Sequence, residues 1–305
     1  MNKELHGIIP ALVTPYTAMD EVDTAGLRWI VSNCVKNGAH SIIVNGSLGE
    51  FTNLNTAERQ SIIKTTIDEV NGKIPVVVGV GSPGTKNAVE LAQEAAELGA
   101  DVLLVLPPFY FQIGEEAVFA HFKTIAESVD TPIMMYNFPG TTKITMSPPL
   151  VARLAQVDGI IGIKNSYDSV MHLRELVRLT KDIKTFSVIA GLEDLLLPGL
   201  MLGARGSVSG LSNFIPQVLV EVYSRYRSGD ISGAADLFNR VVIPLKVLAP
   251  PPEPISALKI GVKLVSGRTN TMVRYPLLDA AQGTEEKMGA FLREQALIPQ
   301  SQAAK

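Results

Sequence analysis

Short apolar runs alternate with longer amphipathic stretches along most of the chain, and the alternation repeats about eight times. Apolar runs bounded by glycine, proline and polar residues indicate strands, and amphipathic stretches between them indicate parallel strands joined by helices. Most of these runs are apolar on both faces, as expected where helices cover one side and a closed barrel interior fills the other. The predicted strands are residues 7–15, 41–46, 74–81, 101–108, 132–139, 160–166, 186–192 and 206–213.

Three predicted helices end in the same small signal, in which a glycine precedes an alanine: Asn37-Gly38-Ala39, Leu98-Gly99-Ala100 and Leu202-Gly203-Ala204. A glycine at this point supplies the left-handed residue that closes a helix before the next strand. Repeated units of this kind favour an α/β fold of the TIM (β/α)8 barrel type over a doubly wound sheet. We therefore predict a catalytic barrel over residues 1–228.

From Gly229 onward the pattern predicts helices with no strand between them, at residues 231–248, 253–266, 271–281 and 285–295. The proline-rich stretch 249–254 is a rigid connector. We predict that residues 229–305 form a C-terminal helical extension packed on the barrel, in preference to an independent second domain.

Composition narrows the class of protein. A chain of 305 residues with 46% hydrophobic and 19% charged residues can bury a large core. Its net charge of -3, with Lys and Arg scattered singly, predicts no nucleic-acid partner and no membrane-surface partner. No run approaches the roughly 20 apolar residues of a membrane span, and the N-terminus has no signal-peptide pattern. The single cysteine, Cys34, is typical of a reducing compartment, so we expect a cytoplasmic protein with a small-molecule partner.

In a TIM barrel, catalytic side chains lie at the carboxyl ends of the strands. Lys164 stands out there, because it closes an apolar run that should be buried, and a lysine is rarely buried without a partner or a task. It could reach the barrel mouth, pair with a carboxylate, or act as an amine nucleophile that forms a Schiff base. The other polar residues at predicted strand ends are Thr14, Asn45, Ser47, Tyr110, Tyr136, Asn137, Gly191 with Glu193, and Ser209.

Tyr136 ends the predicted strand that precedes the strand of Lys164. A tyrosine on a strand is usually core filler. Next to a lysine on the neighbouring strand, it becomes a candidate proton shuttle for Schiff-base chemistry.

Other motifs do not carry a function. Gly79-Val80-Gly81-Ser82-Pro83-Gly84 has dinucleotide-fingerprint spacing, but no acidic residue ends a second strand about 20 residues on. The four histidines are dispersed without metal-ligand spacing. We expect no metal and no cofactor.

Five motifs in order together resemble the dihydrodipicolinate synthase / N-acetylneuraminate lyase family of class I aldolases over essentially the whole chain. They are Gly7-Ile8-Ile9-Pro10-Ala11-Leu12-Val13-Thr14-Pro15, Gly46-Ser47-Leu48-Gly49-Glu50, Pro107-Pro108-Phe109-Tyr110, Tyr136-Asn137-Phe138-Pro139 and Gly162-Ile163-Lys164.

The resemblance implies a pyruvate-type 2-oxo acid held as a Schiff base on Lys164, with Tyr136 as acid and base. It implies that Ser47 links Tyr136 to Tyr110 in a proton relay, and that Tyr110 reaches in from a neighbouring subunit, so a homo-oligomer, a tetramer or dimer, is expected. The backbone amides of Ser47 and Leu48 would bind the substrate carboxylate, as suits a glycine-flanked loop. Glu50 is interpreted as a structural anchor of that loop.

Two positions depart from the family pattern. Leu48 replaces a hydroxyl residue, which removes a side-chain hydrogen bond to the carboxylate. Thr141 stands where the lysine-biosynthetic synthases have an arginine for the carboxylate of the aldehyde partner. The resemblance therefore disfavours dihydrodipicolinate synthesis and favours a neutral or hydroxylated partner, such as a sugar-acid fragment.

Further substrate contacts are implied at the ends of the last two predicted strands. Gly191, Val208 and Ser209 would line the site, and Glu193 and Asp194 align with positions that meet substrate hydroxyls in sugar-cleaving members. The alternative for the two acids is that they complement a helix dipole.

We predict a lyase that reversibly cleaves or condenses pyruvate with an aldehyde, with a 2-keto-3-deoxy sugar acid or a related substrate. A dehydratase that uses the same Lys164 imine on a deoxy-oxo sugar acid remains open. A non-enzymatic protein that binds or senses a 2-oxo acid is the alternative from another class.

Overall fold

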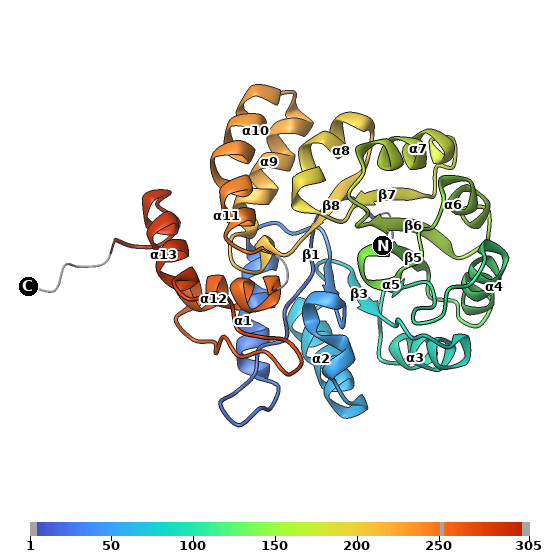
Figure 1. The fold of residues 1–305 in the computed structure, drawn as a ribbon, viewed down its shortest axis with the longest axis horizontal. Helices are drawn as coiled ribbons and strands as arrows, with labels where there is room; N and C mark the ends of the chain where they lie inside the picture. Colours follow the sequence, from blue (N-terminus) through green and yellow to red (C-terminus); the bar gives the residue numbers. More distant parts are fainter. Residues whose placement is uncertain (1–4, 251–252, 301–305) are drawn as a thin grey trace, which may run out of the picture.

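The computed structural model describes residues 5–250 and 253–300, and its centre is a closed, all-parallel barrel of eight strands (Figure 1). Neighbouring strands follow the order β1-β8-β7-β6-β5-β4-β3-β2. A parallel bridge between Ala11 and Ile43, with Leu12 N donating to Ile43 O at 2.9 Å, joins the first and second strands. The strands are β1 Gly7–Pro10, β2 Ile42–Val44, β3 Val76–Gly79, β4 Val102–Val105, β5 Ile133–Asn137, β6 Ile160–Asn165, β7 Ser187–Ala190 and β8 Gly206–Ser209.

Helices alternate with these strands, which confirms the predicted TIM-type barrel. Gly38, Gly99 and Gly203 have φ values of 82°, 96° and 98°, so the repeated glycine signal does end helices in the left-handed conformation. The barrel helices are α1 Thr24–Lys36, α2 Thr56–Val70, α3 Thr85–Glu97, α4 Glu115–Ala126, α5 Pro139–Thr142, α6 Pro148–Leu154, α7 Val170–Thr180, α8 Leu196–Leu202 and α9 Pro216–Ser228.

All of the predicted strands are present, but each is shorter than its apolar run. Residues 206–213 were expected as one strand, whereas β8 ends at Ser209 and Leu211–Asn213 forms a 3₁₀ turn. The buried side chain of Asn213 explains the turn, because its amide donates to Ala11 O at 2.8 Å and to Gly210 O at 2.7 Å. Apolar character continues past the strands because the loops at this end are also buried.

The core has two parts, as the alternation of side chains along a strand requires. A larger cluster fills the space between strands and helices, and a smaller one fills the barrel interior. The interior cluster includes Ile9, Ile43, Val77, Tyr136 and Val208. Tyr136 and Val208 therefore both face the lumen.

The C-terminal helices lie together along one side of the barrel, coloured orange to red in Figure 1. They are α10 Ile231–Leu237, α11 Ile243–Val247, α12 Pro254–Ser266 and α13 Thr284–Glu294, with a π-helical turn, Phe238–Val242, joining the first two. α10 packs on α9, and α12 packs on α13 and on the turn after β8. Pro251 and Pro252 of the predicted connector lie outside the described residues.

The predicted helix over residues 271–281 is wrong, because this stretch has no regular secondary structure. Pro276 lacks an amide donor and disfavours helical geometry in the residue before it. The backbone amides instead find side chains: Met272 N donates to Asn270 Oδ1 at 3.0 Å and Arg274 N to Glu50 Oε2 at 2.9 Å.

No described helix is both long and apolar enough to cross a membrane.

Candidate active site

The loop after β2 makes a sharp corner at the carboxyl end of the barrel. Asn45 and Glu50 both have left-handed backbones, with φ values of 53° and 56°, and Ser47–Gly49 forms a 3₁₀ turn between them. Gly79 on β3 allows this corner, since a Cβ there would lie 2.1 Å from the carbonyl oxygen of Asn45. Thr14 Oγ1 donates to Gly49 O at 2.7 Å and ties the corner to the segment after β1. β3 thus leaves room for the loop after β2, and the segment after β1 holds that loop in place.

Within this corner some backbone amides donate hydrogen bonds and others do not. Gly49 N donates to Gly46 O at 3.0 Å, Glu50 N to Ser47 O at 3.1 Å, and Phe51 N to Gly46 O at 3.4 Å. The amides of Ser47 and Leu48 donate to no acceptor among the described residues. These two donors form a concave, partly exposed pair that suits a carboxylate.

Lys164 and Tyr136 occupy paired positions on β6 and β5. The Lys164 Nζ lies 3.9 Å from the centroid of the Tyr136 ring. Lys164 is 4% exposed, and no described carboxylate lies within 4.0 Å of its Nζ. Neither structural alternative for Lys164, a lysine that reaches solvent or one paired with a carboxylate, fits this environment.

An amide pair on the same two strands keeps these residues in register. Asn137 Nδ2 donates to Asn165 Oδ1 at 2.7 Å, and Met146 N donates to Asn137 Oδ1 at 3.0 Å. Asn137 and Asn165 are fully buried. Asn137, which the sequence singled out as a polar strand end, thus has a structural task beside Lys164 and Tyr136.

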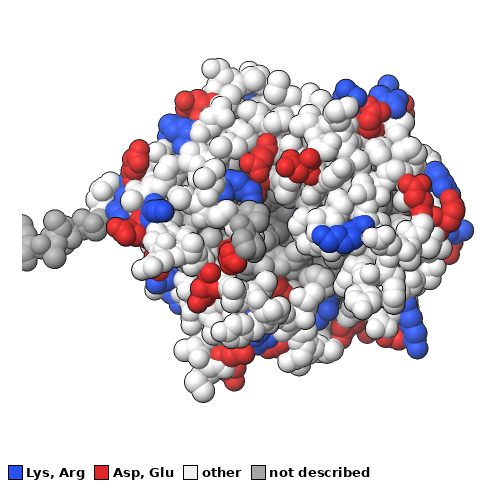
Figure 2. Space-filling view, in the orientation of Figure 1, with Lys and Arg blue, Asp and Glu red and all other residues white. Residues whose placement is uncertain are grey.

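Ser47 and Tyr136 meet at one small cavity at the end of the barrel, although they are far apart in the sequence. Figure 2 shows a hollow near the middle of one face, over the barrel of Figure 1, with acidic and basic side chains interspersed around it. The charges around the hollow create no field of a single sign. The cavity is lined by Asn45, Gly46, Ser47, Phe51, Gly79, Gly81, Leu104, Leu106 and Tyr136.

Tyr110 is one of the predicted site residues that do not line this cavity in the single chain. It is 88% exposed, has a left-handed backbone with φ of 87°, and contacts Phe111 edge to face with ring centroids 5.0 Å apart. Phe111 is itself 72% exposed. Two adjacent aromatic rings are therefore presented to the outside of the chain.

Glu193 has a structural environment that the sequence did not reveal. Its Oε1 accepts hydrogen bonds from Gly210 N at 2.5 Å, Leu211 N at 3.1 Å and Ser209 Oγ at 3.2 Å. Lys246 Nζ on α11 lies 3.9 Å from the other carboxylate oxygen. Glu193 and Ser209 thus hold the loop after β8, while Asp194 is exposed.

The remaining predicted positions are divided between the lumen and the rim. Val208 lies in the barrel interior with Tyr136. Gly191 packs tightly on β6, because a Cβ there would lie 2.1 Å from Ser166 Oγ. Thr141 is exposed on α5, with its hydroxyl donating to Phe138 O at 3.1 Å. Leu48 contacts the loop after β8, with its Cδ1 2.9 Å from where a Cβ on Gly210 would lie.

Sequence reasoning missed Lys259 on α12, which is 1% exposed and donates to Glu50 Oε1 at 2.5 Å. The available signal was a lone lysine inside the apolar helix Pro-Ile-Ser-Ala-Leu-Lys-Ile-Gly-Val. The interpretation of Glu50 as an anchor agrees with this contact. Among the described residues, no group of His, Cys, Asp and Glu side chains is arranged to hold a metal ion.

Comparison with known proteins agrees with the fold and with the motifs at the strand ends. The model of the Dihydrodipicolinate synthetase family matches residues 4–295. The 4-hydroxy-tetrahydrodipicolinate synthase of Methanopyrus kandleri is 34% identical over 302 residues, which cover 98% of this chain and 99% of that protein. The probable 2-dehydro-3-deoxy-D-pentonate aldolase YjhH of Escherichia coli is 33% identical over 300 residues, covering 97% and 99%.

Among solved structures, YagE of Escherichia coli K12, in complex with pyruvate, superposes with a TM-score of 0.91 at 32% identity, covering 96% of this chain and 99% of that one. The family match and these relatives define a lyase of the class I aldolase type, in agreement with the barrel and its buried lysine. The chain belongs to the dihydrodipicolinate synthetase family.

Proposed function

We propose that this lyase forms a Schiff base between Lys164 and pyruvate and reversibly joins pyruvate to an aldehyde, with 2-keto-3-deoxy sugar acids as substrates. The observation that carries the proposal is the buried, carboxylate-free Lys164 amine packed 3.9 Å from the Tyr136 ring. A primary amine attacks a carbonyl through the free electron pair of its nitrogen, and the Lys164 nitrogen has no carboxylate partner among the described residues that would hold it away from a substrate.

In the cleavage direction, the Lys164 nitrogen adds to the C2 carbonyl of the substrate, and loss of water from the carbinolamine leaves an imine. Tyr136 supplies and removes protons in these steps. A base then takes the proton of the C4 hydroxyl, the C3–C4 bond breaks, and its electron pair enters the imine to give an enamine. Aldehyde leaves, C3 is protonated, and water releases pyruvate from Lys164.

The two unused amides of Ser47 and Leu48 supply the substrate carboxylate with donors. Ser47 continues the proton path from Tyr136 to Tyr110. Because Tyr110 is 88% exposed in the single chain, we propose that it enters the cavity of a neighbouring copy and that the active form is a homo-oligomer.

The side chains at the rim of the cavity indicate which aldehyde would bind as the partner of pyruvate. Thr141 offers a hydroxyl where a guanidinium would be needed to bind a second carboxylate, and the charges around the hollow are mixed. A hydroxylated, uncharged aldehyde fits such a rim. This agrees with the sugar-acid aldolase among the relatives.

Incubation with pyruvate and borohydride, followed by mass analysis of the peptide that contains Lys164, tests the Schiff base. An unmodified Lys164 would refute it. A panel of 2-keto-3-deoxy sugar acids, scored for pyruvate release and for loss of water, then separates an aldolase from a dehydratase. Trapping of pyruvate without turnover of any member would indicate a different substrate class or a binding protein.

A further inference from the structure

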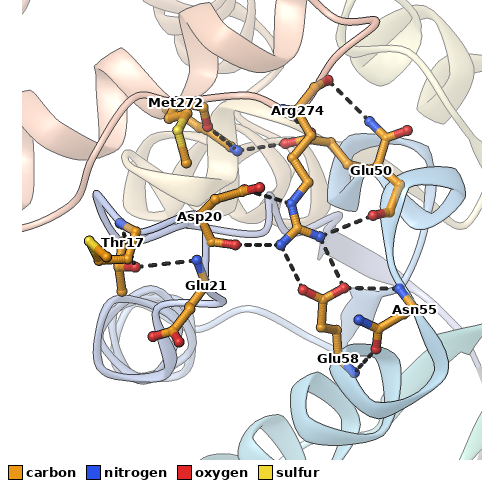
Figure 3. Close-up of polar contacts among 11 residues, drawn as sticks. Thr17, Asp20, Glu21, Glu50, Asn55, Glu58, Met272 and Arg274 are labelled. Carbon is orange, nitrogen blue, oxygen red and sulfur yellow. Dashed lines mark hydrogen bonds and ion pairs between the residues drawn. The ribbon is translucent and has the colours of Figure 1, made fainter.

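A network of charged residues, with a buried centre and an exposed edge, holds the corner that carries Ser47 and Leu48 and is shown in part in Figure 3. It joins segments far apart in the sequence: the loop before α1, the loop after β2, the start of α2, α12 and the irregular stretch after it. We name it the Glu50 network, and its members are Asp20, Glu50, Glu58, Lys259 and Arg274.

Lys259 provides the central contact of the network. Its Nζ donates to Glu50 Oε1 at 2.5 Å and to Met272 O at 2.6 Å, and it lies 4.3 Å from the centroid of the Tyr16 ring. The side chains of Lys259 and Glu50 are 1% and 0% exposed. Burial lowers the pKa of Lys259 to about 8, and the Glu50 carboxylate opposes that shift. An ion pair this deep has no solvent to replace either partner.

Arg274 fastens the same segment from the other side. Its guanidinium forms a bidentate pair with Glu58, at 2.6 and 2.9 Å, and donates to Asp20 Oδ1 at 2.8 Å. It also donates to Asn53 O at 3.0 Å, next to the corner. The backbone amide of Arg274 donates to Glu50 Oε2, so both carboxylate oxygens of Glu50 are held by the C-terminal part of the chain.

Glu50 needs such support because of its backbone. A non-glycine residue at φ 56° and ψ 37° is in a disfavoured region and persists only where surrounding contacts hold it. Its own amide closes the turn onto Ser47 O, so the orientation of this corner determines where the Ser47 and Leu48 amides point. Leu258, beside Lys259, adds an apolar contact to the loop after β8 near Leu48.

We propose that Lys259 and Arg274 are positioning residues, through which the C-terminal helices orient the Ser47 and Leu48 amides toward the substrate carboxylate. This inference rests on the proposed function, since it assigns the network a part in binding the 2-oxo acid. The competing explanation is that the network only fastens the C-terminal helices to the barrel.

The two explanations differ in what Lys259→Met changes. The carboxylate is held alike in the ground state and the transition state, so a misplaced amide pair weakens pyruvate binding without slowing the bound complex. We expect the pyruvate concentration for half-maximal borohydride trapping of Lys164 to rise at least about tenfold, with the trapping rate at saturation within about threefold of wild type. Hydrogen exchange of amides 46–51 should become faster.

Lys263→Met is the matched control, because Lys263 lies one turn further along α12 in an exposed pair with Glu285. It should leave half-saturation and loop exchange unchanged. If Lys259→Met does not fold, Arg274→Lys, which loses the bidentate geometry but keeps the charge, is judged by the same criteria.

Each outcome bears on one proposal. If wild type traps pyruvate and the folded variant has wild-type half-saturation, the positioning role is wrong and the proposed function stands. If wild type traps no pyruvate, the proposed function fails, and loop exchange still reports whether the network orders the corner.

Discussion

Gly79→Ala tests whether the site depends on the close approach of β3 to the corner after β2. The added Cβ would lie 2.1 Å from Asn45 O, 2.7 Å from Asn45 C and 3.2 Å from Gly46 N. All three are backbone atoms, so no side chain can rotate away to relieve the contact. Either β3 or the corner must move.

The size of the effect follows from these distances. Opening the contact from 2.1 to 3.0 Å requires a displacement of about 0.9 Å. Backbone shifts forced by overpacking cost about 1–3 kcal/mol. At about 2–4 °C per kcal/mol for a large domain, Tm should fall by roughly 2–12 °C. A misplacement of about 1 Å costs about 100-fold in rate, so trapping of Lys164 at subsaturating pyruvate, where weaker binding lowers the rate directly, should slow by about that factor.

Thermal unfolding and the rate of borohydride trapping measure the two effects on the same sample. Gly84→Ala is the matched control: Gly84 lies five residues further on, has φ of -105°, and a Cβ there would meet nothing within 4 Å. It should change Tm by less than about 2 °C. Wild-type Tm and trapping rate in Gly79→Ala would refute the argument that this glycine sets the corner.

Three other changes separate function from stability. Lys164→Met should abolish the borohydride adduct and stabilise the fold by about 1–2 kcal/mol in urea unfolding, since it removes a buried amine without a carboxylate partner; a lower stability would contradict this. Tyr110→Phe should slow turnover at least about tenfold with Tm unchanged, because the substitution removes only the hydroxyl and keeps the ring; full turnover would exclude the relay. Burial lowers the pKa of His121 to about 4. Between about pH 6.5 and pH 4, His121 is therefore protonated in the unfolded chain but neutral in the folded one. As the pH is lowered through this window, the free energy of unfolding decreases by about 3 kcal/mol. In His121→Gln the loss measured by urea unfolding at pH 7 and 4.5 should be smaller; an unchanged loss would contradict the assignment.

The barrel and the placement of Lys164 beside Tyr136 were predictable because their signals are local. Apolar runs and terminal glycines mark the strands and helices, and parallel strands bring their carboxyl ends to one rim. Lys164 and Tyr136 were therefore expected together, and they are paired across β6 and β5. The strand ends were overestimated, because residues that directly follow several strands, such as 45–46, 80–81 and 106–108, are as buried as the strands.

The misses have a different cause. Residues 271–281 carry a helical pattern, yet their amides bond to side chains, and Arg274 reaches Glu58 and Asp20, which are distant in sequence. The sequence left open whether Glu193 meets a substrate or complements a helix dipole, and it did not indicate that the loop after β8 supplies Glu193 Oε1 with donors. The spacing of apolar and polar residues along the chain does not indicate which distant donor will bond to a given carboxylate.

By itself, the sequence determined the barrel, its order of elements and the residue types at the strand ends, because these depend on spacing and polarity along the chain. Only the tertiary structure decided which polar residues are bonded within the fold and which remain available to a ligand. The Lys259–Glu50 pair and the Glu193 donors depend on contacts between residues that are distant in the sequence. Those contacts determine whether a polar group is used for folding or remains for a ligand.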